Sequence, residues 1–200
     1  MQGDEWIKGR YLYFVDNIKV EEGKSPEILL WVTLPMSHRG QSVKIEKIYP
    51  EPIELIHDSV NGNEIVLWRE TGLENKERVF FYCDFQVLPE KVETKINPRK
   101  IVAYQKESTE YKRYIRSEPW LEITPEIIEK ATELVDKETN PYFQAKKIFD
   151  WVVANMCYEY PDLKERGAKN SFIKLKGDCG EFSVVFAALC RAVGIPARTV

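Results

Sequence analysis

A helix that is apolar on nearly all of its faces lies close to the C-terminal end of the sequence, and no other segment limits the fold as strongly. Its large apolar side chains recur at helical spacing, at Phe182, Val185, Phe186, Leu189, Cys190 and Val193. Most of the other side is filled by Val184, Ala187, Ala188 and Ala192, so the helix must be buried on most of its surface. Gly194 suits the left-handed position just past the helix end, and Pro196 prevents continuation. The C-terminal part of the chain must therefore build a core around residues 179–193.

The start of this helix carries a cysteine in a position that favours reactivity. Asp178 is the predicted N-cap, and Glu181 follows three residues later, at the spacing of a capping box. Cys179 then becomes the first helical residue, where unpaired backbone amides and the helix dipole stabilise a thiolate. The two carboxylates oppose the thiolate, and Gly180 leaves room for a substrate beside the sulfur. Cys179 is therefore the candidate nucleophile; the alternative interpretation is a small buried hydrophobic residue.

Residues 1–100 predict an antiparallel β-sandwich. Apolar runs, several of them alternating with polar residues, predict strands at residues 10–15, 28–34, 43–48, 53–56, 64–68 and 78–87. Asn61-Gly62, between the fourth and fifth of these runs, is a two-residue hairpin signal. Strands in this number, joined by short turns, are typical of a small sandwich. We expect no chemistry in this domain.

The rest of the chain predicts a linker followed by a helical domain. Residues 101–122 belong to a stretch rich in Lys and Glu and interrupted by prolines, and we interpret them as a linker. Helices are predicted to start at Thr124-Pro125 and at Asn140-Pro141, because a capping residue followed by proline marks a helix N-terminus. Residues 157–176 predict a polar connection. Residues 123–200 thus form the helical part of an α+β chain.

Composition argues against several classes of partner. The formal net charge is −3 and no basic stripe alternates with aromatic residues, so we expect no nucleic acid partner. The apolar stretches are too short to span a bilayer and the acidic N-terminus is unlike a signal peptide, so we expect no membrane partner and a cytoplasmic location. No Cys-x-x-Cys pair occurs among Cys83, Cys157, Cys179 and Cys190. We therefore expect reduced thiols and no metal or other cofactor.

Residues 141–198 resemble the transglutaminase-like superfamily of cysteine enzymes. The resemblance rests on Ala145, Ile148, Asp150-Trp151-Val152, Tyr158, Gly177-x-Cys179 and Arg191-Ala192-x-Gly194-Ile195-Pro196-Ala197-Arg198. It implies a papain-like α+β core, of which residues 123–200 are the helical first half, with Cys179 as nucleophile. It also implies a histidine and an aspartate on the following strands, which complete a Cys-His-Asp triad. The N-terminal sandwich looks like the β domain that often precedes this core.

The histidines of this chain do not fit that triad. His38 and His57 both lie in the β-rich part, and we interpret them as surface or structural residues. The triad histidine and aspartate are therefore expected beyond residue 200. On this interpretation the 200-residue chain is a truncated piece with little or no turnover. Its incomplete core would leave apolar surface open to self-association.

The resemblance implies cysteine-dependent acyl transfer on peptide or carboxamide bonds through a Cys179 thioester, with a protein or peptide as substrate. The reaction would be of the peptidase/amidase type or of the transglutaminase type. The absence of a secretion signal and of a calcium loop from the sequence favours hydrolysis over cross-linking. The alternative is a non-catalytic module that uses the same fold for binding or as a scaffold.

Overall fold

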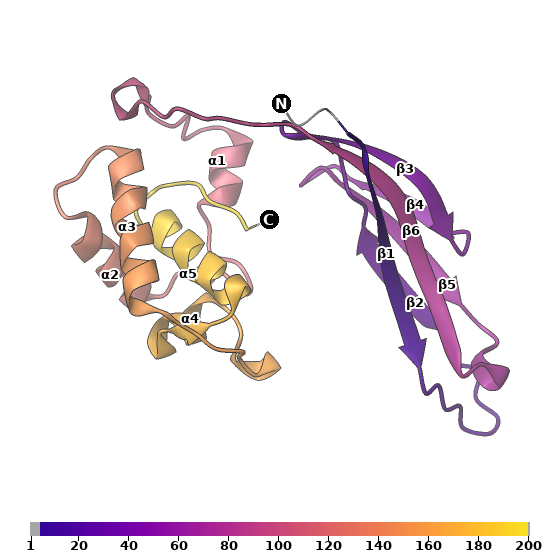
Figure 1. Cartoon of the computed structure of the whole chain (residues 1–200). Coiled ribbons are helices and arrows are strands. Elements are labelled where there is room, and N and C mark those ends of the chain that lie inside the picture. The colour runs from indigo at the N-terminus through magenta and orange to yellow at the C-terminus, as the bar shows by residue number, and fades with distance from the viewer. Residues whose placement is uncertain (1–4, 200) are drawn as a thin grey trace. The chain divides into compact units, whose positions relative to one another are not determined.

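The computed structural model describes residues 5–199, and the chain divides into two compact units, Met1–Thr94 and Lys95–Val200 (Figure 1). The first unit is built from β-strands and the second almost wholly from helices. This arrangement confirms the α+β class predicted from the sequence, with antiparallel sheets first and helices after them.

The first unit consists of two three-stranded antiparallel sheets. One has the order β1 (Ile7–Asp16), β6 (Arg78–Pro89), β3 (Gln41–Tyr49), and the other has the order β2 (Ile28–Thr33), β5 (Asn63–Glu70), β4 (Glu54–Asp58). A 3-10 turn, η1 (Leu73–Asn75), joins β5 to β6. The side chains of β6 alternate, because Val79 and Phe81 are buried while Arg78 and Phe80 are exposed. This two-residue period is the reason that the apolar runs form strands.

The two sheets enclose one hydrophobic core. Val66 and Trp68 of β5 pack there with Val79 and Phe81 of β6. The ring centroids of Trp68 and Phe81 lie 5.5 Å apart. The indole nitrogen of Trp68 donates a hydrogen bond to the carbonyl of Pro50 at 2.8 Å, so the buried polar atom is satisfied. Together these contacts make the predicted sandwich.

The hairpin between β4 and β5 differs from its sequence prediction. Asp58 pairs with Asn63, so the loop has four residues, 59–62, instead of the two of Asn61-Gly62. The carboxylate of Asp58 accepts hydrogen bonds from the amides of Val60 and Asn61 and from the Asn61 side chain. These bonds lower the pKa of Asp58, with the Asn61 side chain as the largest cause. Side-chain bonds to the turn therefore compete with the tighter two-residue turn.

The second unit is a helical bundle with one short strand pair. Its elements in chain order are η2 (Pro98–Lys100), α1 (Thr109–Tyr114), α2 (Pro125–Val135), α3 (Pro141–Asn155), β7 (Cys157–Tyr158), η3 (Leu163–Glu165), α4 (Ala168–Lys174), β8 (Lys176–Gly177) and α5 (Cys179–Ala192). Strands β7 and β8 pair in parallel, with Tyr158 opposite Gly177. The predicted starts of α2 and α3 are confirmed, since Thr124 and Asn140 cap them and proline follows each cap.

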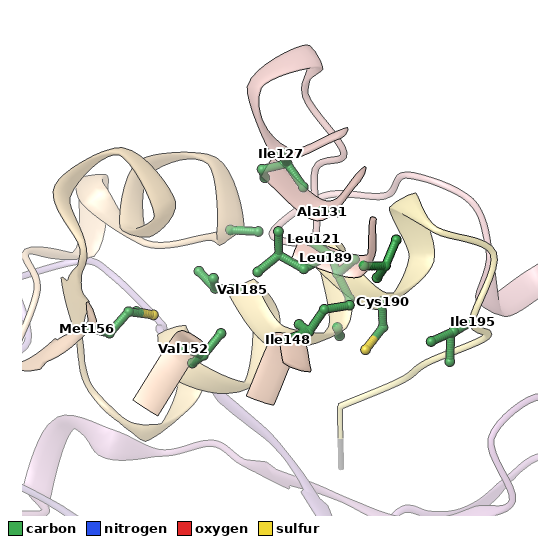
Figure 2. Close-up of a cluster of buried hydrophobic side chains, with 14 residues drawn as sticks. Leu121, Ile127, Ala131, Ile148, Val152, Met156, Val185, Leu189, Cys190 and Ile195 are labelled. Atoms are coloured by element: carbon green, nitrogen blue, oxygen red, sulfur yellow. The ribbon is translucent and has the colours of Figure 1, made fainter. Parts of the chain in front are cut away.

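Helix α5 forms the centre of this bundle and packs against α2, α3 and α4. Figure 2 shows its Val185, Leu189 and Cys190 among apolar side chains of the neighbouring elements. Those neighbours include Ile127 and Ala131 of α2 and Ile148 and Val152 of α3. The helix is therefore buried on most faces, as its composition predicts.

Residues 101–122, which we interpreted as a linker, lie within the second unit. Tyr104 packs against the bundle core, and the hydroxyl of Tyr111 donates to the carbonyl of Gly194 at 3.2 Å. The backbone amide of Ala197 donates to the carbonyl of Tyr114 at 3.0 Å. The segment thus lies against the chain that follows α5.

Arg191 joins the same two segments from inside the protein. Its guanidinium is buried and donates to the carbonyls of Arg116 at 2.6 Å and Ala197 at 2.7 Å. It also forms an ion pair with Glu118 at 2.8 Å. This arrangement, called here the Arg191 clamp, satisfies a buried charge and holds the two segments together.

None of the helices in residues 5–199 has both the length and the apolar composition needed to cross a membrane.

Candidate active site

Cys179 is the first residue of α5 and is exposed, while most of the helix behind it is buried. The chain reaches Cys179 from β8. This strand follows Leu175, whose backbone is left-handed with φ of 51°. Within the helix, the hydroxyl of Ser183 donates to the carbonyl of Cys179 at 2.8 Å. Cys190 lies near the other end of the same helix and differs in environment, because it is buried and this burial raises its thiol pKa to about 12. The cysteine at the helix start is thus the accessible thiol of α5.

Asp178 caps the helix as the sequence predicts. Its carboxylate accepts a hydrogen bond from the amide of Gly180 at 2.9 Å, and its carbonyl accepts one from Phe182 at 3.1 Å. A hydrogen bond with Glu181 is the largest cause that lowers the pKa of Asp178 to about 2. The Gly180 amide and Arg166 lower it further, against the effect of burial. Asp178 therefore stays ionised directly beside Cys179.

Glu181 is buried, with 3% of its surface exposed, in the first turn of an otherwise apolar helix. Burial raises its pKa, and the neighbouring carboxylate of Asp178 raises it further. Arg166, between η3 and α4, meets both acids: Nη2 lies 3.0 Å from Asp178 Oδ2, and Nη1 lies 3.3 Å from Glu181 Oε2. Asp178 and Glu181 are the capping residues that the sequence predicts, whereas Arg166 has no local signal in the sequence.

Gly177 is the residue on which the Glu181 side chain rests. A Cβ atom at position 177 would lie 2.2 Å from Glu181 Cβ and 2.8 Å from its Cγ. Real Cβ atoms do not approach that closely, so only glycine fits unless α5 or β8 moves. The glycine of the Gly177-x-Cys179 motif is thus required by the close approach of the Glu181 side chain.

Two exposed tyrosines lie beside this turn, on and just after β7. The rings of Tyr158 and Tyr160 meet edge to face with centroids 5.8 Å apart. Their hydrogen bond is the largest cause that raises the pKa of Tyr158, and the charges of Cys179 and Asp178 contribute to the same shift. Tyr158 is therefore an exposed aromatic residue at the edge of the cysteine turn.

The histidines lie in the first unit, as the sequence interpretation placed them. Nδ1 of His57 pairs with Glu64 at 2.6 Å across the β4–β5 hairpin. Nδ1 of His38 lies 3.0 Å from the carbonyl of Arg39 in a turn. The second unit holds no histidine. Within residues 5–199, no group of three or more His, Cys, Asp and Glu side chains is arranged to hold a metal ion.

Residues 128–200 match the sequence model of the transglutaminase-like superfamily. An uncharacterized protein of Haemophilus influenzae is 25% identical over 198 residues, covering 92% of this chain and 52% of that protein. The chain therefore spans about half the length of the curated relative that it matches. The part that matches the family model, residues 128–200, includes α3, the Gly177-x-Cys179 turn and α5, which carry most of the resemblance seen in the sequence.

One solved structure of the two compared by superposition shows the same fold. A candidate cysteine protease from Cytophaga hutchinsonii superposes with a TM-score of 0.51 and 15% identity, over 96% of this chain and 67% of that one. A candidate protease from Parabacteroides distasonis gives a TM-score of 0.34 and 14% identity, over 92% of this chain and 35% of that one. The first likeness covers both units and confirms the fold class.

Proposed function

With residues 128–200 identified as a transglutaminase-like core, we propose that this protein is a cysteine-dependent acyl-transfer enzyme acting on peptide or carboxamide bonds. The observation that carries the proposal is the exposed thiol of Cys179 at the capped start of a helix that is otherwise buried. A protein or peptide is the proposed substrate. The name of the Cytophaga protein, a candidate cysteine protease, points to the same type of reaction.

The proposed reaction starts with attack of the Cys179 sulfur on the carbonyl carbon of the substrate amide. The C–N bond then breaks, the amine leaves with a proton, and a thioester to Cys179 remains. Water resolves the thioester to an acid in a peptidase or amidase, and a second amine resolves it to a new amide in a transglutaminase. Hydrolysis is the outcome we propose.

Charge develops on the carbonyl oxygen during attack, and backbone amides at a helix start are suitable donors to it. The amide of Cys179 is the proposed donor. The next amide, of Gly180, already donates to the Asp178 carboxylate at 2.9 Å. Because it makes that bond, the Gly180 amide is already used by the helix cap and is not proposed as a second donor to the carbonyl oxygen.

The proton of the thiol needs a base, and the superfamily resemblance supplies a histidine held by an aspartate. His57 and His38 belong to the first unit and are engaged with Glu64 and with the Arg39 carbonyl. We therefore propose that the histidine and aspartate come from residues that follow position 200. The length of the Haemophilus relative, of which the aligned part covers 52%, is consistent with this proposal.

Replacement of the nucleophile tests the proposal. In the full-length protein, Cys179→Ala should lower cleavage of labelled protein and carboxamide peptides on the order of a thousandfold or more. Cys157→Ala is the matched control, because Cys157 is also exposed and lies in β7, opposite Lys176 of β8, the strand that leads to the same turn. A parallel assay with a fluorescent primary amine separates hydrolysis from amine transfer.

Survival of amide cleavage in a folded Cys179→Ala protein would show that Cys179 is not the nucleophile. If neither wild type nor variant cleaves or transfers, and both retain a binding partner equally, the fold serves as a binding module.

A further inference from the structure

Arg166 has no role in the proposed reaction, yet its guanidinium forms ion pairs with both acids that flank Cys179, Asp178 and Glu181. We propose that Arg166 is a positioning residue for the Cys179 nucleophile, which it supports by tying together the residues on either side of the thiol and by offsetting their negative charge. This inference rests on the proposed function, since it takes Cys179 as the nucleophile.

The geometry of the ion pairs supports a positioning role. The two terminal nitrogens of Arg166 go to different carboxylates, one from Asp178, just before the cysteine, and one from Glu181, two residues after it. A planar guanidinium holds such a pair of acceptors at a fixed separation, which a lysine cannot do. The turn that carries the thiol is therefore fixed from both ends by one side chain.

Packing around Glu181 makes this contact hard to replace. Glu181 is 3% exposed, and its side chain lies so close to Gly177 that no Cβ fits there. Nη1 of Arg166 donates to both oxygens of this buried group, at 3.4 and 3.3 Å, and its removal would leave them without that donor. Among the described residues, Arg166 is the basic side chain that pairs with Glu181 and with Asp178.

The charge around Cys179 also depends on Arg166. Asp178 and Glu181 place two acids next to the thiol, and nearby anions disfavour a thiolate. Other groups on the elements around the turn are already engaged: Lys176 pairs with Glu159 at 2.6 Å, and Tyr158 is hydrogen-bonded to Tyr160. The pKa of Arg166 is raised mainly by its hydrogen bond to Asp178, and also by Glu181 and Cys179. Cys179 is thus within electrostatic reach of the guanidinium.

The experiment measures the reactivity of the thiol directly. The full-length protein, with Cys157→Ala as background, is treated with iodoacetamide at pH 5 to 10, and carboxamidomethylation of the Cys179 peptide is followed by mass spectrometry. The variants are Arg166→Gln, Arg166→Lys and the double variant Arg166→Gln, Glu181→Gln. Lys174→Gln is the matched control, because Lys174 pairs with Glu165 in the same segment and does not contact the two acids.

Arg166→Gln should slow alkylation at pH 8 roughly tenfold and move the midpoint of the rate–pH profile to higher pH, because a cation near the thiol is lost. The double variant should recover most of the rate, since it also removes one carboxylate. Arg166→Lys should recover part of it, and Lys174→Gln should match the background.

An unchanged profile in a folded Arg166→Gln protein would overturn the inference, as would a slow rate that the double variant does not improve. If Arg166→Gln melts below the assay temperature, Arg166→Lys is compared with the background instead. A slower alkylation rate in Arg166→Lys then supports the inference, and an unchanged profile overturns it. Failure of the proposed function would appear elsewhere, as amide cleavage that survives Cys179→Ala while the alkylation results stand.

Discussion

At the scale of single residues, the acid pair beside the cysteine links the stability of the helix start to pH. Asp178 has a pKa of about 2 in the folded protein, below the value of about 3.9 usual for an unfolded chain. Its ionised form therefore stabilises the fold above about pH 4, and this contribution is lost as pH falls toward 2. Glu181 acts in the opposite sense, because its pKa is raised and protonation at lower pH relieves the cost of its burial.

Asp178→Asn should therefore flatten the acid side of the stability profile. Between pH 5 and pH 2, the free energy of unfolding of the variant should fall less than that of wild type, because asparagine can still cap the helix and does not titrate. Urea unfolding at several pH values measures this. Asp150→Asn is the control, since Asp150 is exposed and pairs with Lys146 on the surface of α3. Equal acid slopes for wild type and Asp178→Asn would contradict the assignment.

The roles of Asp178 and Cys179 can be predicted from the sequence because they depend on local spacing. Capping needs only a residue type and its distance from the helix, both visible in the chain. Arg166 was missed because its role depends on contacts at separations of 12 and 15 residues. A glutamate inside an apolar helix signals that a cation partner must exist. The connection before it offers several basic residues, among them Lys164, Lys169 and Lys174, so the sequence cannot choose.

At the scale of elements, the repeat of apolar residues predicts strands and helices well only where an element is long enough to show the repeat. The strands and the helices α2, α3 and α5 have enough residues to show a repeat. Helix α4 has 7 residues and helix α1 has 6, so neither completes a pattern that separates it from a polar connection. The four-residue loop of the β4–β5 hairpin was missed because Asp58 bonds, not the Asn61-Gly62 pair alone, determine its length.

Strand β6 offers a matched pair that tests the sandwich. Phe81→Ala should lower the free energy of unfolding of the first unit by about 3–5 kcal/mol, because Phe81 is fully buried against Trp68. Phe80→Ala, on the opposite face of the same strand with 45% exposure, should cost about 1 kcal/mol or less. Denaturant unfolding of both variants measures the difference. Similar costs for the two would mean that β6 does not have one buried face and one exposed face.

At the scale of the whole molecule, each unit has a hydrophobic cluster of its own, and the second unit includes the segment that precedes its long helices. Sequence composition suggested a linker at 101–122, because Lys, Glu and Pro are typical of connections. The Arg191 clamp and the bond between Ala197 and Tyr114 depend on backbone carbonyls, which no side-chain pattern reveals.

Two polypeptides with different N-terminal ends test whether residues 95–122 belong to the second unit. A polypeptide that starts at residue 95 should fold, whereas one that starts at residue 123 loses Glu118 and the Arg116 carbonyl and leaves the Arg191 guanidinium with one of its three partners. An uncompensated buried charge costs about 3–5 kcal/mol, a large part of the stability of a domain. Thermal melts followed by circular dichroism compare the two. Equal melting temperatures would mean that residues 95–122 add nothing to the fold.

The Arg191 clamp also determines when this unit can fold during synthesis. Its partners are separated by most of the unit: Arg116 leaves the ribosome 75 residues before Arg191, and Ala197 follows 6 residues after it. A nascent chain that has made α2, α3 and α4 still lacks the helix they surround and the arginine that closes the bundle. Contacts of this separation slow folding and keep apolar surface open until both partners have been made. We therefore expect the turn that carries Cys179 to become ordered only after the chain has been made as far as Ala197, a partner of Arg191.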